Sequence, residues 1–288
     1  MIQYLYLGRV GYDEGLRLQA EIAALVAERH FGNVLLLLEH PPVLTLGRNA
    51  NRANVLAGDE LLAARGVTLH QINRGGDATY HGPGQLVGYP IFDLRTLRNP
   101  NGGRMGPVDF VRGIEEALIR LCVGLGVTAG RVPGLTGVWV GSGTEEQGPG
   151  TRRLETVAWP AGAERKIAAI GIHVSKGVTT HGFALNLTTD LRDFELIVPC
   201  GIPDLAVTSL ALELGPSIEV PALESVAHQA ARQFGMVFDE HVLAVESLQA
   251  LRVQADPAAR EFPAQDTPVQ VPAEVERLRG VDAGPVRA

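Results

Sequence analysis

The chain has 288 residues, of which 45% are hydrophobic, and its net charge is −7. This composition can supply a full hydrophobic core, and the acidic balance gives no basic surface for nucleic acid. No stretch approaches the roughly 20 apolar residues of a membrane span, and the amino-terminal segment has no signal-peptide pattern, so we expect a cytoplasmic protein. With only Cys122 and Cys200, neither a disulfide framework nor a cysteine-based zinc site is expected.

The first half of the chain alternates helix and strand patterns. YDEGLRLQAEIAALVAERHFG predicts a helix that ends at Gly32, and NVLLLLEH after it predicts a buried strand. GDELLAARG predicts a second helix. VTLHQIN and QLVGYPIFDL predict strands on either side of residues 74–85, RGGDATYHGPGQ, where four glycines and the absence of an apolar period predict a loop rather than an ordinary strand. PVDFVRGIEEALIRLCVGLG predicts a third, amphipathic helix, and GVWV a short strand.

The second half contains fewer regular elements. Residues 141–164 are rich in glycine and polar residues and predict a flexible insertion. KIAAIGIHVSKGVTTHGFALNLTTDL predicts two strands around a turn at Lys176-Gly177, and ALESVAHQAARQFG a last helix. Residues 245–288 have little apolar content and predict a C-terminal extension with a tendency to disorder, outside a compact domain at 1–244. Strands and helices that mix without regular βαβ alternation predict an α/β (α+β) fold, a mixed sheet flanked by helices.

The loop at 74–85 is the first candidate for chemistry. Its glycines allow close approach of backbone N–H groups to a ligand, and Arg74, Asp77, Tyr80 and His81 add side-chain chemistry. A Gly-Pro turn with a solvated arginine and a structural histidine explains the same residues.

The other candidates are single residues with ordinary explanations of their own. Cys200 follows the apolar run FELIVP and precedes a glycine, yet free cysteines are usually buried and inert, and Cys122 in a helical core stripe fits that description better still. Lys166 opens an apolar strand, where a lysine ordinarily extends to solvent. His181, before Gly182, is more often structural than catalytic.

Six motifs change this balance because they occur together. EHPPVLTLGR, RGGDATYHGPGQLVGYPI, GVWV, KIAAIG, HGFALN and VPCG, in that order between about residues 4 and 215, resemble the lipoyl(octanoyl) transferases. The resemblance implies a catalytic domain at 1–244 related to those of lipoate and biotin protein ligases. It implies transfer of an octanoyl group from octanoyl-acyl carrier protein to a lysine of lipoyl domains, those of 2-oxoacid dehydrogenases and the glycine cleavage H protein. This is the first step of endogenous protein lipoylation.

The resemblance also assigns residues. By motif, Cys200 matches the acyl-thioester nucleophile and Lys166 the lysine that activates it. The substrate-binding positions implied are Arg74, Gly75, Gly76, Asp77, Ala78, Thr79, Tyr80, His81, Ala169, Ile170, Gly171, Gly182, Phe183 and Ala184. No metal, no cofactor, no nucleic acid and no membrane is expected to take part, and a monomer is expected. The insertion and the C-terminal extension are longer than the family pattern requires, but neither touches a motif.

Residue chemistry supports the same function independently. An octanoyl thioester is already activated, so the enzyme needs a nucleophile and no nucleotide. A thiol reacts as its thiolate, and a lysine cation beside Cys200 lowers the pKa of that thiol. Backbone N–H groups of the glycine loops can stabilise the oxyanion. His81 is expected to orient either Lys166 or the incoming amine, Asp77 to pair with Arg74 or a neighbouring N–H group, and Arg48 and Arg74 are candidates for docking acidic partners.

Three other functions remain open from the sequence. The first is an ATP-dependent lipoate or biotin protein ligase, which nucleotide-dependent transfer would reveal. The second is an amidotransferase that relays octanoyl groups between lipoyl domains, which donor competition would separate. The third is a non-catalytic acyl-binding module, against which the presence of both Cys200 and Lys166 argues.

Overall fold

The computed structural model describes residues 1–141, 164–201 and 206–255. Nearly all of the predicted insertion and residues 256–288 of the predicted extension lie outside the described residues. The strands are β1 (Ile2–Arg9), β2 (Asn33–Glu39), β3 (Val43–Leu46), β4 (Thr68–Gln71), β5 (Ala78–His81), β6 (Gln85–Ile91), β7 (Gly130–Val132), β8 (Leu135–Val140), β9 (Arg165–Ser175), β10 (Val178–Asn186) and β11 (Val242–Ala244). The helices are α1 (Tyr12–Ala27), α2 (Asp59–Ala64), α3 (Pro107–Gly124), α4 (Leu210–Leu214), α5 (Leu223–Phe238) and α6 (Leu248–Ala255).

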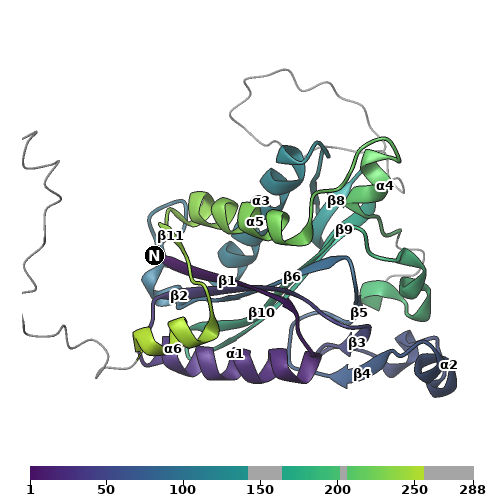
Figure 1. The fold of residues 1–288 in the computed structure, drawn as a ribbon, viewed down its shortest axis with the longest axis horizontal. Coiled ribbons are helices and arrows are strands. Elements are labelled where there is room, and N and C mark those ends of the chain that lie inside the picture. The colour runs from purple at the N-terminus through teal and green to yellow at the C-terminus, as the bar shows by residue number, and fades with distance from the viewer. Residues whose placement is uncertain (142–163, 202–205, 256–288) are drawn as a thin grey trace, which may run out of the picture.

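The predicted mixed sheet is confirmed. Eight strands form it in the order β11-β1-β2-β6-β10-β9-β8-β7, with parallel pairing at the β11-β1-β2 end and antiparallel pairing elsewhere. Helices α3 and α5 cover one face, and α1 and α6 lie on the other (Figure 1). Because both faces of β2 are covered, its run Val34–Leu38 is fully buried, which explains a strand that is apolar without alternation.

Most predicted elements are confirmed, with small shifts at their ends. Helix α1 stops at Ala27 instead of Gly32, and Arg29 just beyond it has the left-handed φ of 63° that ends a helix. The turn between β9 and β10 is at Lys176 and Gly177, with φ of 51° and 85°. Two positive φ values match the right-handed twist of the strands that they join.

A second, three-stranded sheet was only partly predicted. Its order is β4-β3-β5, and with α2 and the segment Leu191–Ile197 it encloses a separate apolar core. Strand β5 lies inside the predicted loop, so the expectation that residues 74–85 contain no ordinary strand is wrong for Ala78–His81. Thr79 and Tyr80 favour extended backbone, and pairing with β3 outweighs the surrounding glycines.

The packed structure extends past the boundary predicted at residue 244. Strand β11 pairs with β1 up to this boundary, and beyond it Leu251 of α6 is buried in the core on the α1 side of the main sheet. Arg252 of α6 forms a two-bonded ion pair with Glu21 of α1, at 2.7 and 2.9 Å. Isolated apolar residues such as Leu251 give too weak a period to be read as a helix from the sequence. Within the described residues, every helix is too short or too polar to cross a lipid bilayer.

Candidate active site

A cavity of about 180 Å³ lies where the small sheet meets β6, β10 and β9 of the main sheet. It is lined by most of the residues that the motifs identify, although they come from distant parts of the sequence. The predicted site residues that line it are Arg74, Gly76, Asp77, Ala78, Thr79, His81, Lys166, Ala169, Ile170, Gly171, Gly182, Phe183 and Ala184. The fold therefore brings three of the motifs together at one place.

Two of the predicted substrate-binding residues do not line this cavity. Tyr80 is buried in the core of the small sheet, where its hydroxyl donates to Asp193 at 2.7 Å and its ring packs against Phe194. Gly75 donates its N–H to the carbonyl of Ile172 at 2.9 Å, which attaches the loop to β9. Both residues thus hold the loop in place.

Arg74 is buried inside the loop. Its guanidinium donates to the carbonyl and hydroxyl of Thr45, each at 2.8 Å, and to the carbonyl of Gly75 at 3.0 Å. A cation with these partners supplies charge to the cavity rather than a surface for docking, so the docking role expected of Arg74 does not fit its position. Arg48, the other docking candidate, is exposed.

Asp77 connects the loop to the segment that carries Cys200. Its carboxylate accepts from the N–H of Ala78 and from the side-chain amide of Asn54, both at 2.7 Å, which is the second of the two roles expected for it. Gly201 lies directly against this carboxylate, since an added Cβ there would be 2.5 Å from Asp77 Oδ2. With a φ of 66°, Gly201 also requires the freedom of glycine.

Three histidines around the cavity are held neutral. Burial lowers the pKa of His81 to about 3 and those of His40 and His181 to about 4. The positive charge of Arg74 acts in the same direction on His81 and His181. His40 also bonds the hydroxyl of Tyr89 at 2.6 Å, and burial raises the pKa of that tyrosine well above its usual range. These groups are therefore uncharged at neutral pH.

The hydrogen bonds of His81 define its tautomer. Gln85 donates its amide to the carbonyl of Tyr80 at 3.1 Å and to Asn186 Oδ1 at 2.9 Å, and Asn186 donates to the carbonyl of Thr208 at 2.9 Å. Because backbone carbonyls only accept, they fix the orientation of both amides. Gln85 Oε1 then faces His81 Nδ1 at 2.8 Å, so Nδ1 carries the proton and Nε2 is left as an acceptor.

Lys166 is buried at the start of β9, 7% exposed, instead of reaching solvent. Its Nζ lies 4.6 Å from the centroid of the Trp139 ring, a cation–π arrangement. Its backbone N–H donates to the carbonyl of Ala206, and its carbonyl accepts from the N–H of Thr208, each at 2.9 Å. Both partners follow Cys200 in the sequence. A small second cavity is lined by Lys166 together with Pro199.

Of the two cysteines, the structure describes the side-chain surroundings of Cys122 alone. Cys122, in α3, is fully buried in the core, and burial raises the pKa of its thiol to about 12. Cys200 belongs to the short 3₁₀ helix Pro199–Gly201, which packs against β5. Its side chain lies outside what the structure describes, and its role as nucleophile stays a prediction.

Several residues of the cavity were not identified from the sequence as binding residues. Tyr12 comes from the start of α1, Tyr89 from β6 and Leu135 from the β7–β8 hairpin. His181 was predicted to be structural, and its ring does bond Asn73 at 2.7 Å, but it also lines the cavity. The available signal was polar aromatic residues inside apolar strands, since such residues usually have a partner when they are buried.

The comparisons with known proteins agree with this geometry. Residues 11–234 match the family model described as the lipoyl protein ligase A/B catalytic domain. An octanoyltransferase of Acidobacterium capsulatum is 56% identical over 250 residues, covering 86% of this chain and 94% of the relative. An octanoyltransferase of Koribacter versatilis is 48% identical over 98% of both chains.

Solved structures agree at the level of the fold. A lipoate-protein ligase A bound with ATP superposes with a TM-score of 0.59 at 16% identity, covering 88% of this chain and 93% of the other. A bipartite lipoate protein ligase of Thermoplasma acidophilum gives 0.58 at 17% identity, covering 92% and 94%. The chain therefore belongs to the lipoyl protein ligase A/B catalytic-domain family, and within it to the octanoyltransferases, which are acyltransferases.

Proposed function

We propose that this octanoyltransferase moves an octanoyl group from octanoyl-acyl carrier protein to a lysine of a lipoyl domain through a thioester on Cys200. The observation that carries the proposal is the position of Lys166. It is buried at the cavity, and its backbone is hydrogen-bonded to Ala206 and Thr208, which follow Cys200 in the sequence. A buried lysine at an acyl-sized cavity, which shares a second small cavity with Pro199 directly before the Gly-flanked Cys200, supports thioester exchange at this place.

The acyl chain would occupy the cavity. Val87, Leu135, Ile170 and Phe183 give it apolar walls. The polar side chains that share the lining, among them His81, would lie toward the reacting carbonyl. Two N–H groups of the loop, on Gly75 and Ala78, are already engaged, so the oxyanion would be stabilised by Lys166 and by other N–H groups around the cavity.

In the first half-reaction the Cys200 thiolate attacks the carbonyl carbon of the donor thioester. The new carbon–sulfur bond forms, the bond to the carrier sulfur breaks, and the carrier leaves as a thiolate that takes a proton from the Lys166 ammonium. In the resting enzyme that ammonium stabilises the Cys200 thiolate and lies over the Trp139 ring.

In the second half-reaction the neutral Lys166 amine is the base. The acceptor lysine attacks the octanoyl thioester, an amide forms, and Cys200 leaves as its thiolate. Lys166 takes the proton that the attacking amine loses, which restores the starting ion pair. His81 accepts a hydrogen bond at Nε2, either from Lys166 or from the incoming amine, so that the proton moves along a defined line.

The test is a covalent one. After incubation with octanoyl-acyl carrier protein and digestion at low pH, we expect an octanoyl adduct on the Cys200 peptide and none on the Cys122 peptide. Cys122→Ala is the matched control and should keep the adduct, whereas Cys200→Ala should lose it. Modification of Cys122 with an unmodified Cys200 would overturn the mechanism.

The same preparation separates the alternative functions. Transfer to a lipoyl domain should proceed at an unchanged rate after treatment with apyrase and EDTA, because an activated thioester needs no nucleotide. A strict nucleotide requirement would instead indicate a ligase. An octanoylated lipoyl domain that outcompetes the carrier as donor would indicate a relay amidotransferase.

A further inference from the structure

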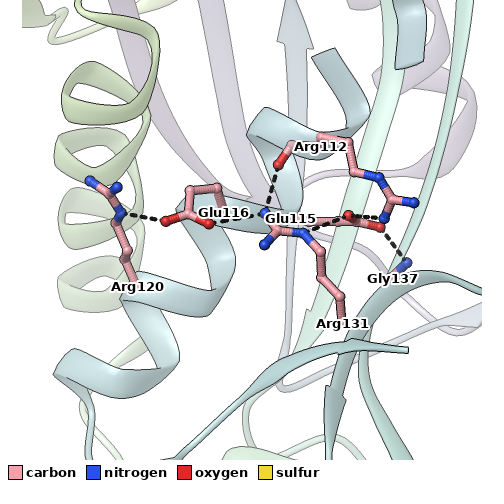
Figure 2. A network of polar contacts seen from close by, with 6 residues as sticks. All are labelled: Arg112, Glu115, Glu116, Arg120, Arg131 and Gly137. Carbon is pink, nitrogen blue, oxygen red and sulfur yellow. Dashed lines mark hydrogen bonds and ion pairs between the residues drawn. The ribbon is translucent and has the colours of Figure 1, made fainter. Parts of the chain in front are cut away.

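Glu115 on α3 is a fully buried carboxylate some distance along the chain from every predicted site residue. It accepts from Arg112 at 2.6 Å, from Arg131 at 3.0 Å and from the backbone N–H of Gly137 at 3.1 Å (Figure 2). Burying a carboxylate is costly unless it is paired and hydrogen-bonded, and here two arginines and one N–H group meet that need. The N–H group is the informative partner, because it belongs to the GVWV motif.

The partners of Glu115 hold the β7–β8 hairpin against α3. Arg131 is in β7 and Gly137 is in β8, so the carboxylate joins both strands of the hairpin to one helix. The connection between these strands, Gly134, together with Leu135 and Thr136, lines the acyl cavity. Glu115 therefore fixes the middle of a hairpin whose tip is a wall of the site.

Gly137 is also in contact with Lys166. A Cβ added to Gly137 would be 3.3 Å from Lys166 Cε and 2.7 Å from the carbonyl oxygen of Ala168. With a φ of 129°, the position excludes other residues. The missing side chain thus leaves the space that the lysine stem occupies.

The strand pairing next to this contact is irregular. Val138 pairs with Ala168, but the next residue, Trp139, pairs with Lys166, so β9 carries one extra residue at Ile167. A bulge of this kind re-aims the side chain beside it. Lys166 is the residue re-aimed, and its Nζ comes to lie over the Trp139 ring.

We propose that Glu115 is a positioning residue for Lys166, acting through the N–H of Gly137. The carboxylate fixes the Gly137 peptide, and that peptide and the bulge hold the lysine stem at the angle that brings Nζ over Trp139 and beside the Cys200 segment. The inference rests on the proposed function, in which Lys166 moves the proton. It gives the GVWV motif a role, since Gly137 leaves space for the Lys166 stem and the Trp139 ring lies under Lys166 Nζ.

Glu116, the next residue on the helix, provides a matched control. It pairs with Arg120 at 2.8 Å and shares Arg131 at 3.0 Å, whereas the N–H of Gly137 donates to Glu115 (Figure 2). Glu115→Gln and Glu116→Gln therefore remove the same charge from the same helix, and only the first disturbs the contact with β8. The glutamine at 115 would also turn its amide N–H groups toward two guanidinium groups.

The first experiment compares steady-state transfer in the two variants. For Glu115→Gln we expect kcat to fall by about tenfold to a hundredfold while KM for octanoyl-acyl carrier protein stays within about twofold, as for a displaced catalytic group. Glu116→Gln should remain close to wild type in both. Equal effects of the two variants, or a loss confined to KM, would overturn the proposal.

The second experiment asks whether Glu115 acts through Lys166. The pH midpoint of Cys200 alkylation by iodoacetamide should rise in Lys166→Ala and in Glu115→Gln, and the double variant should show no further rise beyond Lys166→Ala. Additive shifts would show that Glu115 acts on the fold in general, and would overturn the proposal. If Glu115→Gln does not fold, Arg112→Gln, at a half-exposed position, should give a smaller shift in the same direction, and no shift there would overturn it equally.

The two experiments also keep the proposed function separate. If Lys166→Ala leaves the alkylation midpoint unchanged, or wild-type Cys200 forms no octanoyl adduct, the proposed function fails first. If Lys166→Ala shifts the midpoint and Glu115→Gln does not, the proposed function stands and only the role of Glu115 fails.

Discussion

The cavity and the Glu115 network are both polar regions inside the protein, but the histidines around the cavity are neutral whereas the carboxylates of the network are paired with arginines. Around the cavity, His40, His81 and His181 are kept neutral by burial. In the network, Glu115 meets the guanidinium groups of two arginines and Glu116 pairs with Arg120 (Figure 2). Neutral groups with lone pairs can take part in moving a proton, whereas paired charges hold backbone in place. The difference divides the molecule into a region for chemistry and a region that supports it.

Lys166 is the point where these regions meet, so its removal should have the largest effect. Lys166→Ala should lower the rate of transfer by about 10²- to 10⁴-fold, the usual contribution of a positioned acid–base group. The measurement is single-turnover deacylation of preformed octanoyl-enzyme, together with Cys200 alkylation against pH. Impaired alkylation with normal deacylation would confine Lys166 to stabilising the thiolate.

The neutral histidines should make stability depend on acid. A histidine whose pKa is lowered by folding binds its proton more readily in the unfolded chain. The loss of stability therefore begins as the pH falls below about 6.5 and levels off near the folded-state values of about 4 for His40 and His181 and about 3 for His81. Together the three should contribute a slope of about 4 kcal/mol per pH unit near pH 5 in urea unfolding.

A substitution can assign this slope to the cavity. His181 has a φ of 57°, which asparagine tolerates well, so His181→Asn should fold and reduce the slope by about 1.3 kcal/mol per pH unit. An unchanged slope in His181→Asn would mean that this histidine is not held neutral.

The smallest effect should come from the outer rim of the network. Arg120 is 45% exposed and pairs with Glu116 four residues before it on α3. Arg120→Gln should therefore cost about 0.3–0.5 kcal/mol of unfolding free energy, less in high salt, and leave transfer unchanged. A cost above about 2 kcal/mol, beyond the range for exposed pairs, would show that the rim is coupled to the buried carboxylate.

Much of the fold could be predicted because local pattern and tertiary environment agree there. The continuous apolar run of β2 and the helical period of α3 correspond to surfaces that are buried. Prediction failed where a distant partner decides the structure. Strand β5 forms in a glycine-rich loop because β3 pairs with it. Helix α6 forms because Leu251 packs into the core on the α1 side and Arg252 pairs with Glu21 of α1.

The site divides in the same way. Motifs identified the residues of the cavity that belong to contiguous stretches, such as Ala169-Ile170-Gly171, and the cavity contains them. Tyr12 stands alone at the start of an ordinary helix pattern, so nothing local marks it. In the sequence Glu115 resembles an ordinary exposed charge on a helix. Only the structure shows that it is buried and accepts the N–H of Gly137. The role of Cys200 rests on its motif.

Strand β11 has a consequence for the protein as a molecule in solution. It is three residues long, yet it pairs with the outer edge of β1, whose sequence IQYLYLGR is largely apolar. An uncovered strand of that kind offers its N–H and C=O groups to any neighbouring chain. We therefore expect a protein shortened before Val242 to self-associate through the uncovered edge of β1 while its site residues are still in place. The stretch of chain after α5 thus prevents the sheet from pairing with a second copy of the protein.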